Sequence, residues 1–109
     1  MSQSTSAQRD ALRRLWPAIG DYCAARGLSQ GNLLGGNLGI PVDRVKLAAE
    51  RNRQFMSRAD LASRAGVTRD AVAKIENGVR SPTPAVLDAL LTALSLTPDS
   101  LLLAAPRPS

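Results

Sequence analysis

Apolar residues recur at the spacing of one helix face over residues 7–26. Pro17 lies inside this segment, and a proline removes one backbone hydrogen bond while its ring clashes with the preceding turn. The pattern therefore predicts either a kinked helix or two helices broken near Trp16. The apolar stripe could bind a partner protein or a second copy of the chain. More often such a stripe packs against the rest of its own domain. Its members are Leu12, Leu15, Trp16, Ile19, Tyr22 and Cys23.

A second pattern predicts a helix that begins at Pro41 or Val42 and extends to about Gln54, because proline is tolerated at the first helical position. The candidate core residues of this helix are Val45, Leu47, Ala48 and Ala49. We expect it to pack beneath the segment that follows.

The C-terminal part of the chain predicts one more helix and a short turn. Thr83 is a suitable N-cap and Pro84 a suitable first residue for a helix through Leu94. Thr97 followed by Pro98 repeats that signal before a last turn at residues 101–103. The apolar face of the longer helix consists of Val86, Leu87, Leu90, Leu91 and Leu94.

Between these elements, residues 56–82 contain two short helical patterns that meet at a glycine. Ser57 is a good N-cap for a helix over residues 58–65, and Gly66 can take the left-handed conformation that ends it. Thr68 is the next N-cap, for a helix over residues 69–77. Val67 is expected to be buried, and Val72 and Ile75 to point inward. Two helices joined by a tight turn containing glycine form a helix-turn-helix unit, whose second helix can lie in the DNA major groove.

Residues 27–45 include a glycine-rich stretch, yet they follow the same order of residue types as the helix-turn-helix. Aligned with the helix-turn-helix and allowing one extra residue, this segment indicates a possible degenerate second copy. Chance similarity is the commoner explanation, because short matches of common residue types arise easily. The match does not predict a second DNA-reading helix. The matched pairs are Ser29 with Ser57, Leu33 with Leu61, Gly39 with Gly66, Ile40 with Val67, Asp43 with Asp70, and Val45 with Val72.

The charge balance adds to this picture. The 109-residue chain has 14 basic and nine acidic residues, a formal net charge of +5 and a sequence pI near 10.7. Nine of the basic residues and five of the acidic ones lie between Asp43 and Arg80. A basic face attracts nucleic acid, although the same composition also suits a solvated surface.

Several classes of function are excluded by composition. One cysteine and no histidine rule out an internal disulfide and a Cys/His zinc site, and no pairing of a nucleophile with a base can be assembled. We therefore expect no metal, no cofactor and no enzymatic activity. The longest apolar run, residues 101–105, is too short to cross a bilayer, so we expect no membrane association and a cytoplasmic location. Three aromatic residues are too few for a base-stacking platform.

From about Val45 to Leu102, the order of residues resembles the Cro/C1-type helix-turn-helix family, the Xre-like repressors. The resemblance implies an all-α, lambda-repressor-like bundle of five helices, here preceded by an extra N-terminal helical segment. It also implies a buried ion pair between Arg51 and Glu76. The residues that carry it are Arg51, Leu61, Ala62, Gly66, Val67, Val72, Ile75, Glu76, Asn77, Gly78, Ser81, Pro82, Leu87, Leu90, Leu94, Leu96 and Leu101.

The expected domain organisation has four parts. Residues 1–6 form a disordered tail, and residues 7–40 form an N-terminal helical extension that packs on the core. Residues 41–104 form the DNA-binding domain, and residues 105–109 form a second tail.

A helical wheel for residues 69–77 places the expected DNA-facing side chains opposite Val72 and Ile75. Arg69 is the first choice for reading bases, because a guanidinium makes two hydrogen bonds to guanine. Asp70 has an alternative role in stabilising the helix dipole. The expected base contacts are Arg69, Asp70, Ala73 and Lys74. The expected phosphate contacts are Arg58, Thr68, Asn77, the Gly78 N–H and Arg80, with Arg64 either facing phosphate or simply exposed.

These patterns predict a sequence-specific regulator that binds double-stranded DNA, acts as a repressor-type homodimer and is nucleoid-associated when bound. The alternative is a protein-interaction module of the same fold, antitoxin-like or binding RNA polymerase or another regulator, with a partner held by the N-terminal segment and its Trp16 and Tyr22 stripe.

Overall fold

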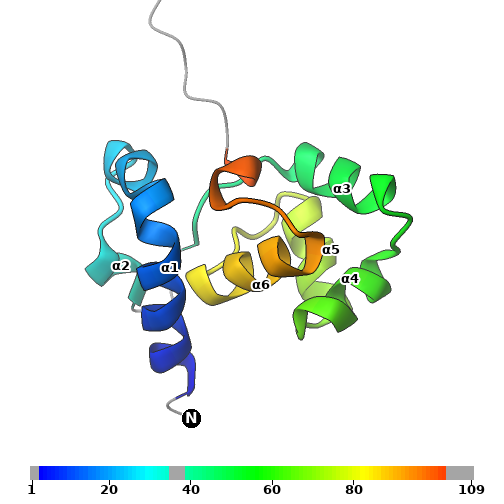
Figure 1. Cartoon of the computed structure of the whole chain (residues 1–109), viewed down its shortest axis with the longest axis horizontal. Coiled ribbons are helices and arrows are strands. Elements are labelled where there is room, and N and C mark those ends of the chain that lie inside the picture. The colour runs from blue at the N-terminus through cyan, green and yellow to red at the C-terminus, as the bar shows by residue number, and fades with distance from the viewer. Residues whose placement is uncertain (1–2, 35–38, 103–109) are drawn as a thin grey trace, which may run out of the picture.

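The computed structural model describes residues 3–34 and 39–102, and within these ranges the chain is all-helical apart from one isolated β-bridge. Figure 1 shows the arrangement: α1 stands along one side of the molecule, α6 lies in the middle, and α3, α4 and α5 form the other side. The expected tail at residues 105–109 lies outside the described residues. The helices are α1 (Gln3–Ala25), α2 (Gln30–Leu34), α3 (Arg44–Arg53), α4 (Arg58–Ala65), α5 (Arg69–Glu76) and α6 (Pro84–Leu94), followed by the 3₁₀ helix η1 (Pro98–Leu101).

Local capping explains where most of these helices begin and end. The side chains of Ser57, Thr68 and Thr83 accept hydrogen bonds from backbone N–H groups of the first turn, as the sequence predicts. Gly66 ends α4 in the left-handed conformation, with φ 71°. Thr97 differs from its expected role, because its hydroxyl contacts the side chains of Asp99 and Ser100 and does not cap η1.

The N-terminal helix is one continuous element. It begins at Gln3, inside the segment for which the sequence predicts a tail, and it contains Pro17 without ending there, so the broken-helix alternative is wrong. Burial compensates for the hydrogen bond that Pro17 removes, since the apolar stripe packs into the core on both sides of it. Gln8 anchors the first part of the helix, because its buried amide oxygen accepts from the backbone N–H of Ala85 at the start of α6, at 2.8 Å.

The beginning of α3 differs from the sequence prediction. Asp43 caps this helix by accepting from the backbone N–H of Lys46, so the helix starts at Arg44, after Pro41 and Val42. The residues before it run extended: Val42 bridges Leu102, and the backbone N–H of Asp43 donates to the carbonyl of Leu101.

The expected core face of α3 is also narrower than predicted. Leu47 is fully buried and Ala48 is half-buried, but Val45 is 71 % exposed and Ala49 is exposed. Since α3 crosses the bundle at its periphery, only one narrow stripe of a ten-residue helix reaches the core. The assignments of Val45 and Ala49 to the core are therefore wrong.

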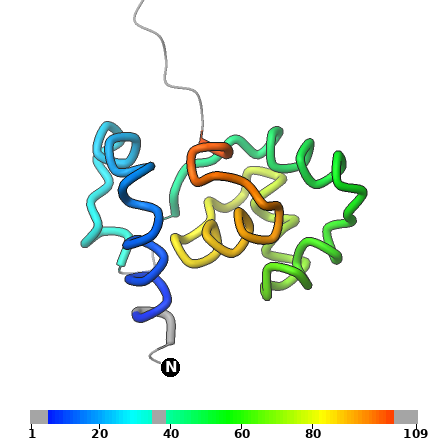
Figure 2. Tube along the Cα trace, in the orientation of Figure 1, coloured from blue at the N-terminus to red at the C-terminus, as the bar shows by residue number. Residues whose placement is uncertain are grey.

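A single core joins the N-terminal helix to the rest of the chain. Helix α1 packs against α6, α2 and η1, while α4 packs against α5 and α6. The tube in Figure 2 shows α6 lying between α1 and the α4–α5 pair. Buried residues of α1 (Leu12, Leu15, Ile19, Cys23) belong to the same apolar cluster as those of α6 (Leu87, Leu90, Leu91, Leu94). Most of the stripe on α1 is therefore buried, while Trp16 and Tyr22 are half-buried and pack against the edge of the core.

The segment between α1 and α3 is hydrogen-bonded both to α1 and to the segment that precedes α6. The hydroxyl of Tyr22 donates to the carbonyl of Pro41 at 2.6 Å, and the backbone N–H of Ile40 donates to the carbonyl of Pro82 at 2.7 Å. Gly39 passes so close to Ser81 that a Cβ atom there would lie 2.2 Å from the Ser81 carbonyl oxygen. Residues 35–38 of the possible degenerate copy lie outside the described residues, so that copy stays a hypothesis.

None of the helices within residues 3–34 and 39–102 has the length and apolarity that crossing a membrane requires.

Candidate nucleic-acid interface

Helices α4 and α5 form the helix-turn-helix, and their packing defines which face of α5 is free. Val72 and Ile75 are buried against the core, as the sequence predicts, whereas Val67 in the turn is only half-buried. Arg69 and Asp70 are exposed at the start of α5, and Ala73 and Lys74 are half-buried farther along. The four expected base contacts therefore lie on or beside the solvent face of one helix.

Two of these side chains interact with each other. The ammonium group of Lys74 lies 3.1 Å from a carboxylate oxygen of Asp70, one helical turn earlier. Such an exposed pair contributes little stability, and both groups remain accessible to a ligand. Asp70 also lies in the first turn of α5, where a negative charge interacts favourably with the helix dipole.

The expected phosphate contacts lie at both ends of α5. Thr68 is at the N-terminal end, where its hydroxyl accepts from the backbone N–H of Ala71. Asn77 and Arg80 are exposed just beyond the C-terminal end. Gly78 differs from the expectation: its backbone N–H donates to the carbonyl of Ile75 at 3.1 Å, so this group is engaged in closing the helix.

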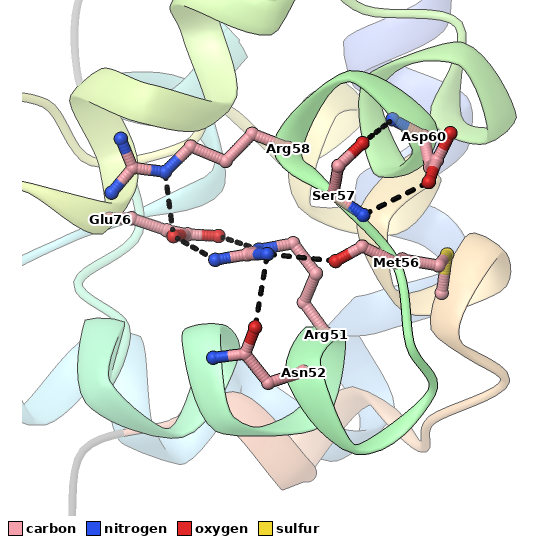
Figure 3. A network of polar contacts seen from close by, with 7 residues as sticks. All are labelled: Arg51, Asn52, Met56, Ser57, Arg58, Asp60 and Glu76. Atoms are coloured by element: carbon pink, nitrogen blue, oxygen red, sulfur yellow. Dashed lines mark hydrogen bonds and ion pairs between the residues drawn. The ribbon is translucent and has the colours of Figure 1, made fainter.

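A compact charged cluster lies beneath α5, where α3, α4 and α5 meet (Figure 3). Arg51 binds Glu76 through two hydrogen bonds, from Nε to Oε2 at 2.7 Å and from Nη2 to Oε1 at 3.0 Å. Its Nη1 atom donates to the carbonyl of Met56 at 2.8 Å. The side chain of Glu76 is 1 % exposed and that of Arg51 is 12 % exposed. The hydrogen bond to Glu76 is the main reason why the pKa of Arg51 is raised.

A second arginine shares this carboxylate. The Nε atom of Arg58 donates to Oε1 of Glu76 at 3.1 Å, and the Arg58 side chain is 36 % exposed (Figure 3). Sequence reasoning placed Arg58 near phosphate but missed this contact, because nothing in the spacing of the two residues indicates it. One carboxylate thus faces two guanidinium groups, which leaves this cluster with a formal charge of +1.

The start of α4 is fixed beside this cluster. Ser57 and Asp60 form a reciprocal capping box: the Ser57 hydroxyl accepts from the backbone N–H of Asp60, and the Asp60 carboxylate accepts from the backbone N–H of Ser57. The hydrogen bond from the Ser57 backbone is the largest cause of a lowered pKa for Asp60. The capping box therefore fixes the backbone position of Arg58, the first residue of α4.

An open depression of about 340 Å³ adjoins the C-terminal end of α5. Arg44 lies across Gly78 there, since a Cβ atom added to Gly78 would be 3.1 Å from the Arg44 Nε atom. Sequence reasoning did not single out Arg44, although it brings another positive charge to the same end of α5. The depression is lined by Pro41, Val42, Asp43, Arg44, Val45, Ile75, Gly78, Arg80 and Ser81.

Comparison with known proteins agrees with this geometry. A family model described as helix-turn-helix matches residues 47–101, just over half of the chain. The chain belongs to the Cro/C1-type helix-turn-helix family. The matched region of this helix-turn-helix protein begins within α3 and ends at η1, so α1 and α2 precede it. No curated protein and no solved structure matches the chain.

Proposed function

We propose that this DNA-binding helix-turn-helix protein is a sequence-specific transcriptional regulator that inserts α5 and its C-cap, residues 69–77, into the major groove. The main support for this proposal is that α5 has one buried face and one exposed face. Val72 and Ile75 pack into the core, while Arg69 and Asp70 are exposed to solvent. Arg69 suits guanine, and Ala73 suits a thymine methyl group. Lys74 suits guanine or a phosphate, and Asp70 can accept from cytosine.

Backbone contacts at both ends of α5 would set the register of the protein on DNA. Arg58 donates its Nε–H to Glu76, and its side chain is 36 % exposed. The two Nη groups point away from that carboxylate (Figure 3). We infer that these groups bind a phosphate, and that Glu76 positions them. Thr68, Asn77 and Arg80 are the remaining phosphate contacts of the proposal.

One short recognition helix reads few base pairs, so we propose that the protein acts as a homodimer on a roughly palindromic site, in the manner of a repressor. The proposed place of action is the cytoplasm, in association with the nucleoid when the protein is bound to DNA. No catalytic activity forms part of this function. We further propose that residues 41–104 are the DNA-binding domain and residues 7–40 an extension that supports it.

The alternative function, a protein-interaction module, keeps only part of the surface on which it was based, because Trp16 and Tyr22 are half-buried. Within the α1 stripe, Leu12, Leu15 and Ile19 are buried. The ring of Tyr22 lies beneath Arg26, and its hydroxyl is bound to Pro41.

The decisive experiment is selection of binding sites from random duplexes, combined with a solution mass measurement of the complex. Arg69→Ala should cost about 1–3 kcal/mol on the selected site and relax the preference at one base position. Arg58→Ala should weaken binding to all sequences and reduce the salt dependence by roughly one phosphate contact. The control is Arg13→Ala, which removes an exposed arginine from α1.

If the selection enriches no site, sequence-specific regulation is wrong. If a monomer occupies a non-palindromic site, the dimer is wrong but the DNA-binding function stands. A selected site that Arg69→Ala binds with unchanged affinity and preference would contradict the role given to that residue.

A further inference from the structure

Two arginines line the depression at the C-terminal end of α5. Arg44 is the first residue of α3 and Arg80 belongs to the loop after α5, and both are exposed. The position of the Arg44 side chain is defined by its close approach to Gly78. A Cβ atom added to Gly78 would lie 3.1 Å from the Arg44 Nε atom and 3.3 Å from its Cζ atom. The guanidinium group of Arg44 therefore lies directly over the backbone at the end of α5.

Neither arginine of the depression has an anionic partner among the described residues. Arg51, Arg53 and Arg58 each bind a carboxylate, whereas no ion pair within residues 3–34 and 39–102 involves the two that line the depression. The acidic residue of the described lining is Asp43, whose carboxylate accepts from the backbone N–H of Lys46 at 3.1 Å. The lining thus has a formal charge of +1 and N–H donors that no described residue accepts, which suits an anion.

The backbone that carries Arg44 is held by distant segments. The backbone N–H of Asp43 donates to the carbonyl of Leu101 in η1 at 2.7 Å. Two residues earlier, the carbonyl of Pro41 accepts from the hydroxyl of Tyr22 in α1 at 2.6 Å. The start of α3 is therefore fixed before any ligand arrives, and binding has to order only the side chain of Arg44. Such preorganisation lowers the entropic cost of binding.

The position of the depression beside α5 identifies the anion. Helix α5 has eight residues, so it is about 12 Å long, which is close to the width of the DNA major groove, about 12 Å. When α5 lies in the groove, its two ends therefore come near the two phosphate chains that border it. Arg58 serves the N-terminal end, and the depression adjoins the C-terminal end. A second copy of the chain is a poor occupant, because symmetric contact through this depression would bring like charges together.

We propose that Arg44 and Arg80 hold a backbone phosphate of DNA in this depression, across the major groove from the phosphate that Arg58 binds. A guanidinium group suits a phosphate because it can donate two parallel hydrogen bonds. The inference rests on the proposed function. It adds a residue of α3 to the DNA surface, and this contact fixes the register of the protein without reading sequence.

The test compares Arg44→Ala with Lys46→Ala on the duplex that the wild-type protein selects. Lys46 is the matched control, because it is an exposed cation of α3 that does not line the depression. Arg44→Ala should bind about tenfold more weakly and reduce the salt dependence by roughly one phosphate contact. Lys46→Ala should change the affinity less than about twofold, because salt screens an exposed charge that makes no contact. The loss in Arg44→Ala should be equal on unrelated duplexes, in contrast to Arg69→Ala.

Ethylation of single phosphates locates the contact. In the wild type, ethylation should interfere with binding at one phosphate on each wall of the major groove. Arg44→Ala should become insensitive at one of these positions and stay sensitive at the other, which Arg58→Ala should lose. Urea denaturation should give Arg44→Ala the stability of the wild type, because Arg44 is exposed and forms no ion pair with a described residue.

Three results would overturn the inference. Equal losses of affinity in Arg44→Ala and Lys46→Ala would assign Arg44 to the general positive field, as would an unchanged interference pattern. A loss of stability with full DNA affinity would assign it to the negative end of the α5 dipole.

Failure of the proposed function gives a different result. If the wild type binds duplexes but selects no site, sequence-specific regulation is wrong, and the same two variants compared on a random duplex still decide the role of Arg44. If the wild type binds no duplex, both proposals are wrong.

Discussion

Different kinds of interaction hold the helices on the two sides of α6. On one side, α1 meets α6 mainly through buried leucines and isoleucine. The polar contacts there include the buried Gln8 amide on the backbone of Ala85 and the ion pair between Arg14 and Asp88. On the other side, α3, α4 and α5 meet around the buried carboxylate of Glu76. An apolar contact is non-directional and depends on the area removed from water. By contrast, the hydrogen bonds from Arg51 and Arg58 to the Glu76 carboxylate are directional, so each guanidinium group must lie at a defined distance and angle from it.

This difference suggests a division of labour. The apolar contact of α1 adds stability and tolerates small shifts, whereas the charged cluster fixes the arrangement of α5 and Arg58. Buried ion pairs contribute little net stability, but removing one partner is costly, because the charge that remains has lost its compensation. Three predictions test this comparison from the largest effect to the smallest.

Glu76→Gln should have the largest effect on stability. The change leaves two guanidinium groups without a carboxylate, and we expect a loss of about 4 kcal/mol in the free energy of unfolding, measured by urea denaturation. Glu50→Gln is the matched control, because Glu50 pairs with Arg53 in an exposed position and should cost less than about 1 kcal/mol. Equal effects of the two substitutions would show that the buried cluster does not behave as one unit.

Ile19→Ala should come next. Ile19 is fully buried on α1, and truncating it removes apolar contacts and leaves a cavity that costs roughly 3 kcal/mol. DNA affinity of the folded protein should not change, since α5 and its supports are untouched. Denaturation and DNA binding measured on the same preparation check both statements. A loss of DNA affinity at full folding would show that α1 also positions the recognition helix.

The smallest effect concerns the pH dependence at the start of α4. The pKa of Asp60 is lowered in the folded protein by hydrogen bonds from Ser57. Its contribution to stability is therefore present above the ordinary carboxyl pKa and is lost as the pH falls below about 4, through the lower folded value. The measurement compares wild type with Asp60→Asn by thermal melting across this range. The small stability difference at neutral pH should shrink in acid, and a constant difference would contradict the assignment.

The sequence alone was sufficient for the elements whose causes are local. Ser57, Thr68 and Thr83 cap helices because each hydroxyl meets an N–H group three residues later, and Gly66 ends α4 because it has no Cβ. The inward positions of Val72 and Ile75 follow from the helical repeat. Resemblance to the family added the pair of Arg51 and Glu76.

Only the tertiary structure decided the features that depend on distant segments. Arg58 and Glu76 are 18 residues apart and meet because α4 and α5 pack at one angle. Val45 lies outside the core because only one narrow face of α3 contacts the rest of the bundle. Helix α1 continues past Pro17 because the burial of its apolar face against α6 outweighs the loss of one backbone hydrogen bond. Sequence spacing describes neighbours within a turn or two of helix. Which charge is shared, and which apolar residue stays in water, depends on how whole helices pack against one another.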